Sequence, residues 1–71
     1  MIIKGTVKYQ DISGGFWGVI DQQGEHWKPV KMPKKLQKEG LGIEIEAKKA
    51  TNVFSVFMWG TPIHISEYKI L

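Results

Sequence analysis

The side chains that could act in catalysis are three serines, two histidines and two aspartates, scattered along the chain. They are Ser13, Ser55, Ser66, His26, His64, Asp11 and Asp21. Acyl transfer of the serine-hydrolase kind needs a serine on a sharp strand-to-helix turn, held beside a histidine and a carboxylate. No local motif of that kind joins these residues. The sequence therefore predicts no catalytic residues and a protein that is not an enzyme.

A metal site is the next chemistry that these side chains could support. His26 and His64 lie in different segments, with Asp21 and Glu25 close to the first histidine. Two imidazoles and a carboxylate can ligate a transition metal, but no two of these residues have the spacing of ligands on a single element. The chain also contains no cysteine, which excludes thiolate ligands and disulfides. We therefore predict no metal and no cofactor.

The remaining chemistry is that of a binding face made of lysines and aromatic side chains. The candidate ligand-binding residues are Lys4, Lys8, Phe16, Trp17, His26, Lys28, Lys48 and Lys49. Phe16 and Trp17 are adjacent, so one of them must point out of the sheet if this segment is a strand. The outward one would adjoin His26 and Lys28. A stacking aromatic flanked by lysines is the minimal apparatus for binding single-stranded nucleic acid.

The charge of the chain argues against a dedicated phosphate site. Ten lysines and no arginine, against seven acidic residues, give a net charge of +3 at pH 7. Arginine makes the bidentate contacts to phosphate and guanine, whereas lysine supplies looser, salt-sensitive attraction. Glu44 and Glu46 also alternate along a neighbouring predicted strand, as on an ordinary soluble surface. We therefore predict a non-catalytic binding module for a protein or small ligand; the alternative is a module for single-stranded nucleic acid.

A predicted β-hairpin positions the centre of this face, and its register has two solutions. If residues 22–24 form a three-residue loop with a left-handed glycine, Ile20 lies opposite His26. If the turn has two residues, Ile20 lies opposite Trp27 and every side chain changes face. The three-residue loop is favoured, because the tighter turn needs Gln23 at positive φ, where glutamine is disfavoured. The favoured register turns these side chains inward: Trp17, Val19 and Trp27.

Three other segments have the alternating pattern of half-buried strands. Residues 2–9 form the first, and Gly5 within it predicts a bend or a close backbone approach. Residues 43–48 form the clearest strand of the chain. Residues 63–70 change phase near Ser66, which is the signature of a β-bulge.

Two less regular segments complete the expected order of elements. Residues 33–39, which begin with Pro33 and are followed by Gly40, have the signals of a short helix. Residues 53–59 are apolar without a clear period, and we interpret them as a short strand or turn that plugs one end of the core.

Strand, strand, strand, short helix, strand, strand is the element order of the OB fold. We therefore predict one all-β domain over residues 1–71, a five-stranded OB-like Greek-key barrel with one short helix between strands 3 and 4. An SH3-like barrel is the alternative, but it places a longer loop earlier in the chain. The predicted core is Val7, Val19, Trp27, Leu36, Ile43, Ile45 and Ile63.

Four short motifs also suggest a family. They are Gly5-x-Val7-x-Tyr9, Gly15-Phe16-Trp17-Gly18, Asp21-x-x-Gly24-x-x-Trp27-x-Pro29 and Met58-Trp59-Gly60-Thr61. With these motifs the chain resembles a group of small uncharacterised prokaryotic OB-like proteins. More distantly, it is similar to the C-terminal OB domain of NlpE-type envelope lipoproteins. Glycines, prolines and aromatics specify a fold rather than a reaction, so the resemblance implies the OB barrel and no particular activity.

No apolar run approaches the roughly 20 residues that a membrane-spanning helix needs. The first residues also lack the charged and apolar regions of a signal peptide. We therefore expect a monomeric cytoplasmic protein with no membrane association.

Overall fold

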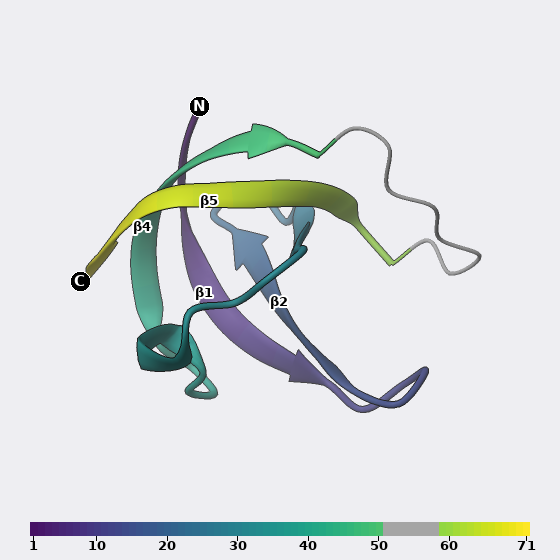
Figure 1. The fold of residues 1–71 in the computed structure, drawn as a ribbon. Coiled ribbons are helices and arrows are strands. Elements are labelled where there is room, and N and C mark those ends of the chain that lie inside the picture. Colours follow the sequence, from purple (N-terminus) through teal and green to yellow (C-terminus); the bar gives the residue numbers. More distant parts are fainter. Residues whose placement is uncertain (51–58) are drawn as a thin grey trace.

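The structure of this protein, a computed structural model, describes residues 1–50 and 59–71 and places five β-strands in one barrel. The strands are β1 (Ile2–Gln10), β2 (Phe16–Asp21), β3 (His26–Pro29), β4 (Gly42–Lys49) and β5 (Thr61–Ile70). They follow the order β1-β2-β3-β5-β4, and β4 pairs with β1 to close the barrel (Figure 1). Only β3 and β5 are parallel among the paired strands described. The predicted all-β, OB-like barrel of five strands is confirmed.

The short helix predicted between β3 and β4 is present as a single 3-10 turn, η1 (Lys34–Leu36), which is shorter than the predicted range of residues 33–39 (Figure 1). Pro33 stands before the turn, and Gln37 leaves the helical conformation with a ψ of 66°. One or two turns of helix cannot offset the cost of nucleation by themselves. The turn is instead held by the side chain of Leu36, which is fully buried.

The β2–β3 hairpin has the favoured register. Val19 lies opposite Trp27 and Ile20 lies opposite His26. Gly24 closes the three-residue loop with a φ of 83°, a conformation that glycine adopts without steric cost. The prediction of a three-residue loop is therefore confirmed, and it decides which side chains of the hairpin face outward.

Gly5 marks a close approach between β1 and β2, as its place within a strand pattern predicts. It lies opposite Asp21. A Cβ atom on this glycine would lie 2.5 Å from the carbonyl oxygen of Ile20, which real side chains do not tolerate. The two strands can therefore be this close only because residue 5 has no side chain.

The bulge predicted near Ser66 is present in β5. Glu46 of β4 lies opposite Glu67, but the next residue, Ala47, lies opposite Ile65. Ser66 is thus the extra residue, and its Oγ donates a hydrogen bond to the carbonyl oxygen of Glu46 (3.1 Å). The phase change read from the sequence is therefore a bulge in the strand itself.

The core of the barrel is apolar, and no polar or charged side chain is buried among the described residues. Its buried side chains are Ile3, Val7, Val19, Met32, Leu36, Ile43, Ile45, Ala47 and Ile63. Six of the seven predicted core residues are among them. Trp27 is the exception, because it packs against the core but is only partly buried.

One predicted segment and the question of a membrane span remain to be compared with the structure. The prediction for residues 53–59 falls largely outside the described residues, and only Trp59 and its successors can be placed. The described residues contain no helix with the length and hydropathy that a membrane span needs.

Candidate functional site

The outer face of β1, β2 and β3 is the surface on which the sequence placed a binding site. Side chains alternate across these strands, so the residues opposite one another share a face. Lys8 of β1 lies opposite Gly18 of β2, and both are on the outside because the neighbouring Val19 is fully buried. Phe16 is two residues before Gly18 and therefore also faces outward.

Three rings meet on this face, and we call Phe16, His26 and Trp59 the aromatic cluster. The His26 and Trp59 rings are stacked, with centroids 4.5 Å apart and planes 13° from parallel. Phe16 meets Trp59 edge to face at 5.3 Å. Pairs with these geometries contribute about 0.5–1.5 kcal/mol each beyond their buried area. The cluster joins three segments that are far apart in the sequence.

Trp59 lies against the barrel because Gly18 has no side chain. A Cβ atom on Gly18 would overlap the six-membered part of the Trp59 indole. A second glycine, Gly60, lets the chain next to Trp59 come close to β3, since a Cβ on Gly60 would lie 2.7 Å from the carbonyl oxygen of His26. The two glycines therefore allow the chain that leads into β5 to lie flat on the outer face of the hairpin.

Lys28 brings a positive charge to the aromatic cluster. Its Nζ lies 4.7 Å from the centroid of the Phe16 ring, within the range of a cation–π contact. Such a contact is worth about 0.5–1 kcal/mol near the surface. It also fixes an ammonium group beside an aromatic surface, which is the combination that the sequence predicted for this face.

Trp17 does not belong to this face. It packs against the core from the inner side of β2, and it meets Tyr9 edge to face with centroids 5.0 Å apart. Of the two adjacent aromatics, Phe16 is therefore the outward one. The favoured hairpin register requires this outcome, because Trp17 shares the phase of the buried Val19.

Two of the candidate lysines are engaged in ion pairs with glutamates. Lys4 Nζ lies 3.6 Å from Glu44 Oε1, and Lys8 Nζ lies 3.4 Å from Glu39 Oε2. Glu39 also accepts a hydrogen bond from the backbone N–H of Tyr9 (2.6 Å). That hydrogen bond, followed by the nearby Lys8 ammonium, lowers the pKa of Glu39 below its ordinary value. The positive charge of this face is therefore partly balanced within the protein.

Lys48 and Lys49 lie apart from the other candidate residues. They are at the end of β4, opposite His64 and Ile63 of β5 respectively. Since β5 lies between β4 and β3 in the barrel, it separates both lysines from the hairpin. The structure thus brings together Phe16, His26 and Lys28, with Lys8 on the next strand, and leaves the remaining candidates elsewhere.

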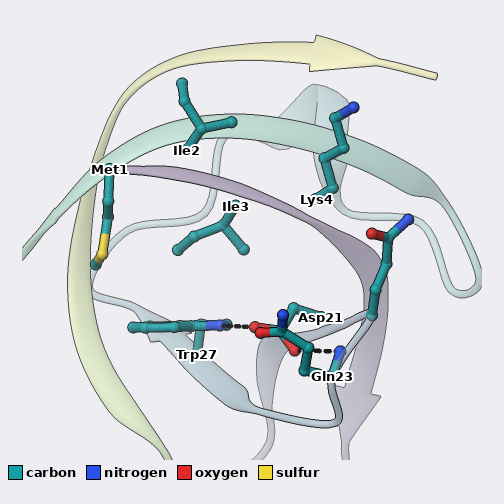
Figure 2. Close-up of a pocket in the computed structure, with 8 residues that line it drawn as sticks. Met1, Ile2, Ile3, Lys4, Asp21, Gln23 and Trp27 are labelled. Atoms are coloured by element: carbon teal, nitrogen blue, oxygen red, sulfur yellow. Dashed lines mark hydrogen bonds between the residues drawn. The ribbon is translucent and has the colours of Figure 1, made fainter.

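Asp21 fixes the hairpin that carries this site. Its Oδ1 accepts hydrogen bonds from the backbone N–H groups of Gln23 and Glu25, both at 2.9 Å. Its Oδ2 accepts one from the indole Nε1 of Trp27, also at 2.9 Å (Figure 2). The hydrogen bond from Trp27, ahead of those from the backbone, lowers the pKa of Asp21. The carboxylate thereby holds the conformation of the loop and fixes the Trp27 side chain near the start of β3.

Trp59 is the residue of the site that the sequence analysis missed, because it was assigned to a plug of the core. The described structure places it on the outer surface instead. A signal was available in Gly18, which interrupts an apolar strand between Trp17 and Val19. A glycine in that position indicates that another group approaches the backbone closely.

The fold and the site together define an OB-like barrel with an aromatic cluster and a lysine on the outer face of its hairpin. Among the described residues, no three histidine, aspartate or glutamate side chains gather as metal ligands do. No family model, no curated protein and no solved structure matches this chain. The function must therefore be argued from the site alone.

Proposed function

We propose that this protein is a non-catalytic binding module whose ligand, a protein segment or a small molecule, lies on the outer face of β1, β2 and β3. The observation that carries the proposal is the aromatic cluster itself. Trp59 packs on Phe16 and His26, on the opposite side of the hairpin from the buried core residues that the structure describes. Aromatic side chains on the outside of a barrel are typical of binding sites. When these side chains are already fixed by their neighbours, a ligand does not lose affinity to the entropy cost of ordering them.

The charges of this face favour a neutral or weakly charged ligand. Lys4 and Lys8 are paired with Glu44 and Glu39, so their contribution to a phosphate-binding surface is reduced. Exposed ion pairs are weak, but each places a carboxylate beside the lysine that a phosphate would have to approach. A ligand that depends on aromatic and apolar contact is not affected by this balance.

Single-stranded nucleic acid is the second candidate, and one observation favours it. Lys28 lies over Phe16 beside the stacked pair of His26 and Trp59, which places an ammonium group next to aromatic rings, the combination that single-stranded nucleic-acid sites use. This candidate predicts an affinity that falls steeply as salt is added, whereas the first predicts little dependence on salt.

An NMR titration of labelled protein separates the two candidates. The probes are N-acetyl-tryptophanamide for aromatic contact and mixed single-stranded DNA and RNA oligomers for nucleic acid. Shifts of Phe16, His26, Lys28 and Trp59 that persist in added salt support the first candidate. Shifts at the same residues that appear only with oligomers and vanish with salt support the second.

A matched pair of variants tests whether the aromatic cluster is the site. Phe16→Ala should abolish the response to the effective probe. Tyr68→Ala, which removes another exposed aromatic from β5, should leave the response unchanged. A response that survives Phe16→Ala, or that maps to the acidic outer side of β4, would show that the ligand binds elsewhere.

A further inference from the structure

β1 has a stretch of open edge at its beginning. The pairing of β1 with β2 ends where Gly5 lies opposite Asp21. From Ile2 to Lys4, β1 continues as a strand and stays paired with β4 on its other side. Among the described residues, β2 therefore provides no partner for this stretch, and one edge of it remains open.

The hydrogen bonds of β1 show which of its residues face the open edge. Met1 accepts a hydrogen bond from the N–H of Ala47 (2.8 Å), and Val7 donates one to the carbonyl of Leu41 (2.8 Å). Both odd-numbered residues thus bond on the β4 side. Because backbone groups of a strand point to alternate sides, the even-numbered residues direct their N–H and C=O groups the other way.

Ile2 and Lys4 therefore direct their backbone groups toward a hollow beside β1. The hollow is lined by Met1, Ile2, Ile3, Lys4, Asp21, Gln22, Gln23 and Trp27 (Figure 2). In Figure 2 the Ile3 side chain lies above the Trp27 ring, and Asp21 and Gln23 lie at the other end. An apolar floor thus lies beside two sets of backbone donors and acceptors.

The charged groups around the hollow already have partners. Lys4 is paired with Glu44. The carboxylate of Asp21 accepts hydrogen bonds from Trp27 and from two backbone N–H groups of the loop. What the hollow offers a ligand is therefore neutral: backbone groups, the amides of two glutamines and the apolar faces of Ile3 and Trp27. This balance selects an uncharged ligand.

We propose that this hollow binds an extended peptide segment of a partner protein, which adds as a strand beside Ile2–Lys4. The backbone groups of Ile2 and Lys4 are two residues apart, which is a spacing of about 6.6–6.8 Å in a strand. An extended peptide repeats its own donors and acceptors at the same interval, whereas a helix does not. A small apolar side chain of the peptide, opposite Ile3, would lie on the Trp27 ring.

Strand addition of this kind draws its affinity from main-chain hydrogen bonds and its specificity from alternate side chains. The hollow and the aromatic cluster lie on different sides of the hairpin, because Trp27 faces inward and His26 faces outward. The proposal is therefore independent of the function proposed for the outer face, and either can fail without the other.

The experiment uses the pentapeptide acetyl-Ser-Val-Thr-Val-Ser-amide at millimolar concentration as the probe. Two further peptides carry N-methyl groups, one on both valines and the other on the threonine and the last serine. We expect the parent peptide to slow hydrogen exchange at the amides of Ile2 and Lys4. One methylated peptide should bind at least about tenfold more weakly and the other like the parent, because only alternate N–H groups face β1.

An Ile2→Pro variant provides the complementary test. Proline removes the N–H that faces the hollow and no hydrogen bond to β4, so the barrel should remain folded while the peptide response is lost. Ile2→Thr is the matched control and should respond like the parent protein. If Ile2→Pro does not fold, the methylated peptides decide the matter alone.

Three results would overturn the proposal. The first is equal binding by both methylated peptides, which would mean that the backbone does not pair. The second is a response centred on Phe16 and His26 rather than on Ile2 and Lys4. The third is the absence of any response at the Ile2 and Lys4 amides.

Discussion

Replacing Gly18 by alanine is expected to lift Trp59 off the barrel while leaving the core intact. Gly18 faces outward, and an added Cβ would overlap the Trp59 ring, so the ring must move. The move breaks the stack with His26 and the edge contact with Phe16. The inner side of β2 is unaffected, because its buried residue, Val19, faces the other way.

The size of the effect follows from the two ring contacts. Each contributes about 0.5–1.5 kcal/mol, so their loss costs about 1–3 kcal/mol. Gly42→Ala is the matched control, because it lies in β4 and, among the described residues, its added Cβ would meet Leu71 at an ordinary 3.9 Å and nothing closer. A glycine-to-alanine change also stabilises a compatible site by about 0.4–1 kcal/mol through the unfolded chain, and this gain is common to both variants. Their unfolding free energies should therefore differ by about 1–3 kcal/mol, with Gly18→Ala the less stable.

Urea denaturation and NMR measure the two halves of this prediction. With an m-value of about 1–3 kcal/mol/M, the midpoints of the two variants should differ by on the order of 1 M. In the parent, the stacked face of Trp59 should shift the ring protons of His26 upfield, and in Gly18→Ala alone these protons should return toward their ordinary positions. Equal midpoints together with unchanged His26 shifts would show that Trp59 does not rest on Gly18.

Three further predictions concern the barrel itself. Leu36→Ala should lower the free energy of unfolding by about 2–5 kcal/mol in urea, because Leu36 is fully buried and holds η1 to the core. Gly5→Ala should cost about 1–3 kcal/mol by the same measurement, since the added Cβ meets the rigid backbone of Ile20. The pKa values of Asp21 and Glu39 are lowered by folding, so these carboxylates stabilise the protein fully above their ordinary values of 3.8 and 4.5. That stability should be lost as the pH falls through their folded-state pKa values, and Glu39→Gln should remove part of the loss from a thermal melting series.

The parts of the fold that the sequence predicted correctly depend on local chemistry. The hairpin register follows from the conformations that Gln23 and Gly24 can adopt, and the bulge at Ser66 from a change of phase within one strand. Both signals lie within a few residues of the feature they specify. A two-residue periodicity with one interruption leaves few other ways to bury the apolar side chains of a strand.

The length of the turn before β4 could not be predicted in this way, because the residues that follow it bond to a distant strand. The N–H of Gly40 donates to the carbonyl of Val7, and the N–H of Val7 donates to the carbonyl of Leu41. The N–H of Gly40 is thus not available to the carbonyl of Leu36, to which it would donate if the helix continued to its end. The proline and glycine signals in the sequence describe only the local preference for a helix. They do not report the hydrogen bonds that Gly40 and Leu41 make to Val7 of β1.

The candidate site shows the same division. Phe16, His26 and Lys28 come together because all three belong to one hairpin whose register is local. The partners that balance Lys4 and Lys8, and the Trp59 ring that covers Gly18, arrive from later strands and loops. Their placement depends on how the barrel closes. Gly18 indicates that some group approaches β2 closely, but not which residue of the later chain supplies it.

The hairpin also links the two proposed binding surfaces and explains how they can be tested apart. His26 and Trp27 are neighbours in β3 and face opposite sides of the sheet, so one short strand serves the aromatic cluster and the hollow beside β1. Asp21 holds the loop and the Trp27 indole together, and a change there would disturb both surfaces. Gly18, in contrast, faces only the outer surface and contacts the aromatic cluster but not the hollow. A change at Gly18 therefore alters the outer face while the hollow, bounded by the inner side of the same hairpin, keeps its shape.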